Sequence, residues 1–310
     1  MLSLIVIALT FILVSLVAGN NLSSCTGAII SGKIVTKKSG VAIAVMGYIA
    51  GLVLEGGILK NGVSALLPVN STLFITIALS VSIIIFLYAH IKKIPNSLSF
   101  TFASVILGIS AAAGLSTNFA FVITMVAFWV LTPIVSILLT LSMMKGSRTI
   151  IDKKNVWGTI NKIKISLVVV SFFTAFTLGA NTIGFIYSAI PADNDNLAVV
   201  IVALIFGSIA LSGGELNKIG NEIIPFRYLN SITSQLSSAI IVEFATLFGI
   251  PMSNTQAFTM SIYGAGLSYK NRLLIKKPVF DIIRAWIYMI IVSFVAAFAL
   301  TYFSIHFAAL

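Results

Sequence analysis

The sequence predicts an all-α polytopic membrane protein built from two inverted-topology repeats, and three observations support that fold class. Hydrophobic residues make up 59% of the chain and charged residues only 9%, whereas soluble domains carry about 25% charged residues. Apolar stretches recur along the whole sequence, and a helix needs about 20 apolar residues to cross a bilayer. Short motifs also recur in the same order in both halves. We therefore expect about 10–12 membrane segments, some of them broken or half helices.

The composition also excludes several functional classes. The net charge is +11, but the basic residues lie in short loops beside apolar stretches, as membrane topology requires, so we expect lipid and not nucleic acid as a partner. The single cysteine, Cys25, excludes an intramolecular disulfide. No Cys/His cluster has metal-ligand spacing and no nucleophile lies beside a base. We therefore expect neither an enzyme nor a cofactor, and no certain metal site.

The longest polar stretch, residues 145–164, divides the chain into two repeats. It holds six basic residues against one acidic residue, which predicts a cytoplasmic loop by the positive-inside rule. It also lies at the chain midpoint. The predicted organisation is a first membrane repeat over 1–144, a basic cytoplasmic linker over 145–164 and a second membrane repeat over 165–310.

Matching positions relate the two halves. Pro95 matches Pro251 at an offset of 156 residues, and Gly108 matches Gly264 at the same offset. The tripeptide Gly-Asn-Asn at 19–21 has a counterpart in Gly-Ala-Asn at 179–181. The pair Gly56-Gly57 also matches Gly213-Gly214 at an offset of 157 residues. Four matches in the same order indicate a duplication.

The charges next to these matches differ in sign or presence, which indicates that one half is inverted relative to the other. A basic loop in the second half has an uncharged counterpart in the first half, and a Lys pair in the first half corresponds to acidic residues in the second. In each case the basic member belongs in the cytoplasm. The residues concerned are Lys270, Arg272, Lys276 and Lys277 for the loop, Lys37 and Lys38 for the pair, and Asp193 and Asp195 for the acids.

Inverted repeats with interrupted helices are typical of secondary transporters, whose substrate lies near the bilayer midplane between unwound segments. Irregular backbone at that depth must be buried in protein or line a cavity. We expect such interruptions at residues 19–21, 94–99, 179–181 and 250–256.

Two second-half segments resemble motifs of the PiT family of phosphate transporters. Gly179-Ala180-Asn181-Thr182 resembles a Gly-Ala-Asn-Asp motif, and residues 251–256 (Pro-Met-Ser-Asn-Thr-Gln) resemble Pro-x-Ser-Thr-Thr-His. Residues 19–21 and 94–99 are looser first-half copies. The resemblance implies a plasma-membrane symporter of inorganic phosphate, coupled to Na⁺ or H⁺ and often dimeric. A sulfate permease of the same fold is the alternative, followed by a passive anion channel or a non-transporting subunit.

The resemblance also implies which residues bind the anion. The motif positions carry hydroxyl and amide side chains, and a Ser/Thr-rich stretch after proline can start a helix whose free N–H groups face an anion. The candidate substrate-binding residues are Asn20, Asn21, Ser97, Ser99, Asn181, Thr182, Ser253, Asn254 and Thr255, with a possible Na⁺ position near Asn20 and Asn181.

The sequence departs from the family at the positions of its acidic residues. The family aspartates correspond to Asn21 and Thr182, and two family glutamates correspond to Tyr48 and Gln235. Gln256 stands where the family has a histidine. An acid within an apolar segment is a functional candidate because it is costly to place in a membrane. The ion-coupling candidates are therefore Glu243, Gln235 and Gln256, and we expect Glu55 at the membrane interface.

Overall fold

The computed structural model describes residues 4–69, 71–92, 96–150, 156–191, 194–211, 228–269 and 277–307. All secondary structure in these ranges is helical. Several residues that entered the repeat and charge comparisons lie outside the described residues, namely Ile94, Pro95, Asp193, Gly213, Gly214 and residues 270–276. Residues 151–155 of the predicted linker lie outside them as well.

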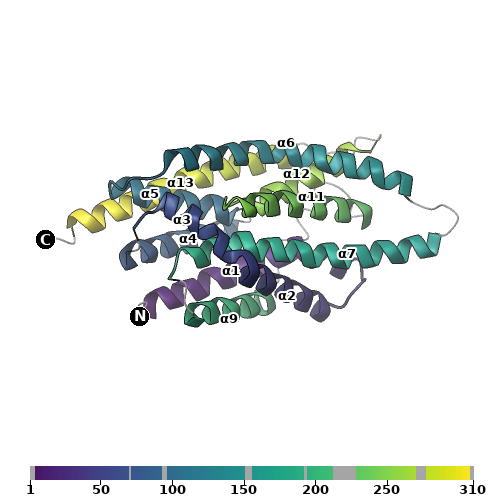
Figure 1. Ribbon diagram of the computed structural model, residues 1–310, viewed down its shortest axis with the longest axis horizontal. Coiled ribbons are helices and arrows are strands. Elements are labelled where there is room, and N and C mark those ends of the chain that lie inside the picture. The colour runs from purple at the N-terminus through teal and green to yellow at the C-terminus, as the bar shows by residue number, and fades with distance from the viewer. Residues whose placement is uncertain are drawn as a thin grey trace.

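The chain forms a bundle whose helices run mostly along the long axis of the molecule (Figure 1). The first-half elements are α1 Leu4–Ser31, α2 Lys37–Glu55, the 3₁₀ helix η1 Gly56–Leu59, α3 Lys60–Leu66, α4 Thr72–Lys92, α5 Leu98–Ala112 and α6 Phe119–Ile150. The second-half elements are α7 Val156–Leu178, the π-helical turn η2 Gly179–Ile183, α8 Gly184–Ser188, α9 Asn194–Ala210, α11 Tyr228–Leu247, α12 Asn254–Leu267 and α13 Lys277–Phe307.

Six helical segments of the described chain are long and apolar enough to cross a membrane. They are Leu4–Ser31, Lys37–Leu66, Thr72–Ala89, Phe119–Ser147, Ile160–Ser188 and Phe280–His306. Leu98–Ala112 and Asn194–Ala210 are shorter apolar helices. The protein is therefore an all-α polytopic membrane protein, as predicted.

The helix boundaries of the two halves are related by the same 156-residue offset as the matching motif residues. Shifting α4, α5 and α6 by 156 residues places them on α11, α12 and α13 to within two residues at every end. In Figure 1, α7 runs in the opposite direction to α1, and α13 runs in the opposite direction to α6. The two halves therefore have the same helix order with inverted direction.

The two halves interlock by exchanging helix contacts. The most extensive contacts include α5 with α13, α12 with α6, α1 with α9 and α7 with α2. Each of these pairs joins one half to the other. The repeat relation converts α5–α13 into α12–α6, and α1–α9 into α7–α2, as a two-fold relation between the halves requires. Neither half could keep these contacts alone.

The matching glycines Gly108 and Gly264 occupy equivalent contacts in this interlock. A Cβ on Gly108 would collide with the Phe294 carbonyl of α13, and a Cβ on Gly264 would lie 2.8 Å from the Ile137 carbonyl of α6. Small residues let membrane helices approach closely enough for backbone contact. Both short helices therefore pack tightly against the long last helix of the other half.

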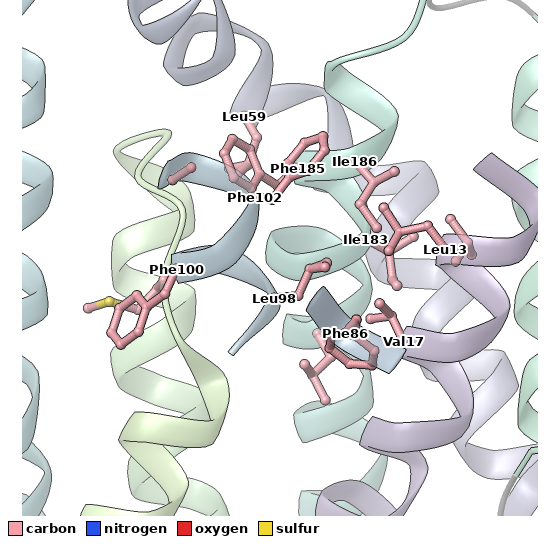
Figure 2. Close-up of a cluster of buried hydrophobic side chains, with 14 of the residues drawn as sticks. Leu13, Val17, Leu59, Phe86, Leu98, Phe100, Phe102, Ile183, Phe185 and Ile186 are labelled. Atoms are coloured by element: carbon pink, nitrogen blue, oxygen red, sulfur yellow. The ribbon is translucent and has the colours of Figure 1, made fainter. Parts of the chain in front are cut away.

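Buried apolar side chains from both halves meet beside the interrupted segments. In Figure 2, Phe102 of α5 faces Phe185 of α8, next to Leu59 of η1. The Phe102 and Phe185 rings lie 5.2 Å apart in an edge-to-face arrangement, a favourable geometry for aromatic pairs. This cluster fixes α5 against the segment that follows η2.

Two of the four expected interruptions are clear, and two differ from expectation. Helices α5 and α12, with 15 and 14 residues, begin after irregular backbone around Ser97 and over 250–253. Residues 179–181 form a π-helical turn without a break in the chain. The expected break at 19–21 is wrong, because α1 is continuous from Leu4 to Ser31. No proline removes a backbone donor there.

Candidate anion site

The short helices α5 and α12 begin with the same serine cap. Ser97 has extended backbone (φ −106°), and its hydroxyl accepts a hydrogen bond from the Phe100 N–H at 3.4 Å. Ser253 has φ −81°, and its hydroxyl accepts from the Gln256 N–H at 3.1 Å. Both serines are buried. A cap satisfies only one of the first-turn N–H groups, so each helix start keeps further donors and a partial positive charge.

The two helix starts meet in the interior of the bundle. The Ser99 hydroxyl in the first turn of α5 donates to the Met252 carbonyl, next to the α12 cap, at 2.7 Å. The Trp129 indole N–H of α6 donates to the Pro251 carbonyl at 2.9 Å, and its ring lies 4.5 Å from the Phe100 ring. The backbone carbonyls before α12 are therefore occupied by protein donors, which leaves the N–H side of the helix start for an anion.

Asn181 in the π-helical turn holds the segment before α12 in place. Its amide nitrogen donates to the Thr246 hydroxyl at 2.9 Å and to the Ile250 carbonyl at 3.0 Å. Its amide oxygen accepts from the Met252 N–H at 2.8 Å. Both N–H donors of this fully buried side chain are thus used within the protein. Asn181 positions the α12 start and has no donor left for an anion in this geometry.

The first turn of α12 carries polar side chains without partners. Asn254 is 4% exposed, and within the described part of the chain neither its amide nitrogen nor its amide oxygen has a hydrogen-bond partner. Gln256 is 6% exposed and its amide oxygen is likewise without a partner. Buried polar groups are nearly always hydrogen-bonded, so unsatisfied amides at a helix start suggest a polar ligand.

The sequence pattern did not single out Asn96 and Trp129, which the structure places at this site. The Asn96 amide oxygen accepts from the Thr101 hydroxyl at 3.0 Å, while its buried amide nitrogen has no partner among the described residues. Its position directly before the Ser97 cap is the sequence feature that could have identified Asn96. Trp129 was harder to identify from sequence, because its role depends on a hydrogen bond to Pro251, 122 residues away in the chain.

The remaining predicted binding residues have different surroundings. Thr182 is buried beside Asn181 and Thr255 is half-buried in the first turn of α12. The hydrogen bonds of the described residues do not join Asn20 or Asn21 to the starts of α5 or α12. Gly19, next to them, lies against α9. Asn20 keeps a buried amide oxygen without a partner in the described ranges.

Gln235, an ion-coupling candidate, uses its side-chain amide for hydrogen bonds to neighbouring helices. It donates to the carbonyls of Ser24 and Cys25 on α1, at 3.0 and 2.9 Å, and accepts from the Ser171 hydroxyl at 3.3 Å. Tyr48 contacts the same place, with its hydroxyl 3.6 Å from the Cys25 sulfur. The two positions that correspond to family glutamates therefore meet at Cys25 as neutral groups.

Glu243, the acidic candidate, lies on α11 with its side chain partly buried. Its Oε2 atom has no hydrogen-bond partner among the described residues. Glu55, which we expected at the membrane interface, ends α2, is also partly buried and has an Oε2 atom likewise without a described partner. It directly precedes η1, and η1 packs against η2.

The fold defines a class: an α-helical transporter with two inverted repeats, in which the candidate site lies between the starts of two short helices. The model of the phosphate transporter family matches residues 17–297. The chain belongs to that family.

Individual relatives agree with this assignment. A Methanocaldococcus jannaschii protein described as a phosphate permease is 21% identical over 290 residues, covering 94% of each chain. The sulfate permease CysP of Bacillus subtilis is 26% identical over 270 residues, covering 83% of this chain and 75% of the relative. A solved structure, "The sodium-dependent phosphate transporter", superposes with a TM-score of 0.83 at 15% identity, covering 97% of this chain and 98% of that one.

Proposed function

We propose that the protein is a symporter that carries inorganic phosphate across the plasma membrane, bound between the starts of α5 and α12. The observation that carries this proposal is the convergence of two serine-capped helix starts, joined by the Ser99–Met252 hydrogen bond. Helix N-termini bind anions through free N–H groups and the helix dipole. The resemblance to the PiT family and the phosphate transporters among the relatives support phosphate as the substrate.

The predicted ligands divide into two groups under this proposal. Ser97, Ser253, Asn254 and Thr255, with Gln256 and Asn96, supply donors at the two helix starts. Ser99 joins the two starts through its bond to the Met252 carbonyl. Asn181 holds the loop that precedes α12, and Thr182 is buried next to it. Asn20 and Asn21 lie on an unbroken helix and belong to an outer or alternate position, and Na⁺ near Asn20 or Asn181 remains part of the proposal.

Sulfate is the second candidate substrate, and a specific observation favours it. The described side chains at the two helix starts are neutral, and a sulfate permease is among the relatives. Sulfate is fully ionised at neutral pH, so it needs donors and no proton acceptor. A passive anion channel of the same fold would conduct either ion without accumulating it.

Membrane orientation follows from the basic residues. Residues 145–164 comprise the last turns of α6, residues 151–155 and the first turns of α7. We place this basic segment in the cytoplasm by the positive-inside rule. A homodimer is part of the proposal through the family resemblance. Exposed apolar side chains on α6 and α13 would face lipid or a second copy.

Counterflow in proteoliposomes tests the function directly. Vesicles preloaded with unlabelled phosphate or sulfate are given the labelled anion outside, with and without Na⁺ and a pH gradient. Phosphate exchange supports the main proposal, and sulfate exchange that exceeds phosphate exchange by about tenfold, or 1.4 kcal/mol, supports the alternative. Uphill accumulation excludes a passive channel. Exchange of neither anion contradicts the proposed function.

A further inference from the structure

One face of α6 runs along α11 and α12 from the candidate anion site toward the end of α6. At the anion site, the Thr132 hydroxyl lies 3.4 Å from the sulfur of Met252, the residue before the α12 cap. Farther along α6, the Met143 sulfur accepts a hydrogen bond from the Ser237 hydroxyl of α11 at 3.1 Å. Residues 132 and 143 lie about 16 Å apart along the helix axis.

Two hydroxyl groups between these contacts lack partners. Ser136 and Thr140 are fully buried, and neither hydroxyl has a hydrogen-bond partner in the part of the chain that the structure describes. They follow Thr132 at successive intervals of four residues, so all three lie on one side of α6. The hydroxyls of Thr124 and Thr132 donate to the carbonyl four residues earlier, which is the common arrangement within a helix. Ser136 and Thr140 therefore differ from other hydroxyls of the same helix.

The helices that pack against this face add hydroxyls of the same kind. Ser234 of α11 is three residues before Ser237, so it also faces α6. Ser261 of α12 is three residues before Gly264, whose Cβ position lies 2.8 Å from the Ile137 carbonyl of α6. Ser234 and Ser261 are buried, and their hydroxyls have no described partner. The four residues, named the hydroxyl seam below, are Ser136, Thr140, Ser234 and Ser261.

The packing of the repeat does not require these hydroxyls. The equivalent helices α13, α4 and α5 carry apolar residues at the positions of the hydroxyl seam, namely Val292, Ala296, Ala78 and Val105. Hydroxyls without described partners in those helices, including Ser82 and Ser110, lie at other positions. A buried hydroxyl without a partner costs free energy. The hydroxyl seam is therefore a feature of α6, α11 and α12 that helix packing alone does not explain.

A polar contact closes the far end of the hydroxyl seam. The Asn230 amide oxygen near the start of α11 accepts a hydrogen bond from the Tyr269 hydroxyl, which lies just after α12. The Asn230 amide nitrogen is buried without a partner among the described residues. This end of the seam lies toward the basic segment 145–164, which includes the last turns of α6 and which we place in the cytoplasm.

Helix α6 contains a proline at the other end of the seam, next to the anion site. Pro133 lies inside α6 and has no N–H, so the Trp129 carbonyl loses its usual helical donor. Prolines are the commonest places where helices bend. Bending at Pro133 would move the part of α6 that carries Ser136 and Thr140 away from α11 and α12.

We propose that the hydroxyl seam is the route by which the oxyanion passes between its site at the α12 start and the cytoplasmic face. The inference deepens the proposed function and rests on it. Hydroxyls donate to anion oxygens and accept from water, so they replace hydration without a fixed charge that would retain the ion. The seam is closed in this structure, and it opens when α6 moves and the Asn230–Tyr269 hydrogen bond breaks.

Thiol labelling tests whether the seam opens to water. A charged thiol reagent added on the cytoplasmic side of membrane vesicles should label Ser136→Cys and Ser261→Cys, and saturating phosphate should slow the labelling. Wild type measures the background, because its one cysteine, Cys25, is buried. Both variants should react about tenfold faster than Thr10→Cys, which lies at a buried position of α1 outside the seam, because buried groups react only when the structure opens.

This measurement needs no transport, so it separates the seam from the proposed function. Labelling no faster than that of Thr10→Cys, or labelling only from the outer side, would overturn the seam even if wild type exchanges phosphate. Labelling from the cytoplasmic side in a wild-type background that exchanges neither anion would contradict the proposed function and leave a seam that opens to water.

Removing two hydroxyls tests whether the anion uses the route. Ser136→Ala combined with Thr140→Val should not lower the unfolding temperature, because the lost hydroxyls have no described partner. Saturating phosphate should stabilise the double variant as much as wild type, since the anion site is intact. Counterflow at saturating anion should slow about tenfold, because the moving anion loses hydrogen-bond donors. Thr10→Val, which removes another buried hydroxyl without a described partner, should keep the wild-type rate. Wild-type counterflow in the double variant would overturn the route, as would equal slowing by Thr10→Val.

Discussion

Among the hydrogen bonds of the described residues, the start of α12 is held by more side chains from other helices than the start of α5, although the two occupy equivalent positions in the repeat. Three side chains from outside α12 hold the segment before it: Asn181, Trp129 and Ser99. The segment before α5 has a local bond within its own helix start, from Thr101 to Asn96. The two halves thus share the serine caps but differ in the side chains that hold the segment before each cap.

The same asymmetry appears in the first helix of each half. In the second half, the π-helical turn presents Asn181 to the loop before α12. In the first half, α1 continues unbroken past Asn20, whose amide oxygen has no described partner. The asparagine at the shared motif position is therefore a positioning residue in one half and an unsatisfied polar group in the other. Sequence similarity between repeats does not imply an equal role for each copy.

The largest effect is expected from replacing Asn181. Asn181→Leu removes three hydrogen bonds and leaves the Ile250 carbonyl and the Met252 N–H buried without partners. Each orphaned group costs about 1–3 kcal/mol. We expect a clear drop in the thermal unfolding temperature in detergent and loss of anion exchange.

The first-half equivalent provides the matched control. Asn20→Leu removes an amide whose oxygen has no described partner, so the unfolding temperature should stay close to wild type. Equal destabilisation by the two changes would contradict the asymmetry.

Glycine substitutions test the interlock, where the two halves should behave alike. Gly108→Ala and Gly264→Ala each place a Cβ against a backbone carbonyl of the other half's last helix. Overpacking of this kind costs about 1–3 kcal/mol. Both variants should unfold at lower temperature than wild type.

Gly146→Ala on α6 is the control, because nothing lies within 4 Å of its Cβ position. Alanine favours a helix by about 1 kcal/mol over glycine there. A Gly264→Ala protein as stable as Gly146→Ala would show that the close approach of α12 and α6 is not required.

Several of these features could be predicted from the sequence, because they depend on short stretches of the chain. Proline, serine and glycine at matching offsets are sufficient to place the starts of α5 and α12 and the contact glycines Gly108 and Gly264. Mean composition and apolar length are sufficient for the polytopic helical class. Each of these signals depends on residues close together in the chain.

The features that the sequence did not reveal depend on distant contacts. The π-helical turn at Asn181 forms where groups at 246, 250 and 252 satisfy its amide. The similar segment at 19–21 has no such described partners, so the predicted break there did not form. The contacts between helices of the two halves likewise join residues that lie far apart in the sequence.

A change at the α12 start should separate binding from folding. In the repeat, Asn254 corresponds to Leu98 and Gln256 to Phe100. Asn254→Leu gives α12 the first-half residue and removes a buried amide without a described partner. The unfolding temperature should not fall, while the KM for the transported anion should rise about tenfold, or 1.4 kcal/mol.

The reverse change in the first half sharpens this comparison. Leu98→Asn places a polar amide in a buried apolar site, which should lower stability without improving transport. An unchanged KM in Asn254→Leu would remove Asn254 from the anion site.

The smallest effects are expected at the two caps. Ser97→Ala and Ser253→Ala each remove a side-chain acceptor from a first-turn N–H group, which costs about 1 kcal/mol of helix stability. The Ser253 bond is 3.1 Å and the Ser97 bond is 3.4 Å, so Ser253→Ala should lower the unfolding temperature more. If the anion itself completes the cap, saturating phosphate or sulfate should restore part of the lost temperature in both variants, because a ligand that binds only the folded state stabilises it. If the anion restores the unfolding temperature of Ser253→Ala but not that of Ser97→Ala, the anion binds at the start of α12 alone. The start of α5 would then only support the start of α12.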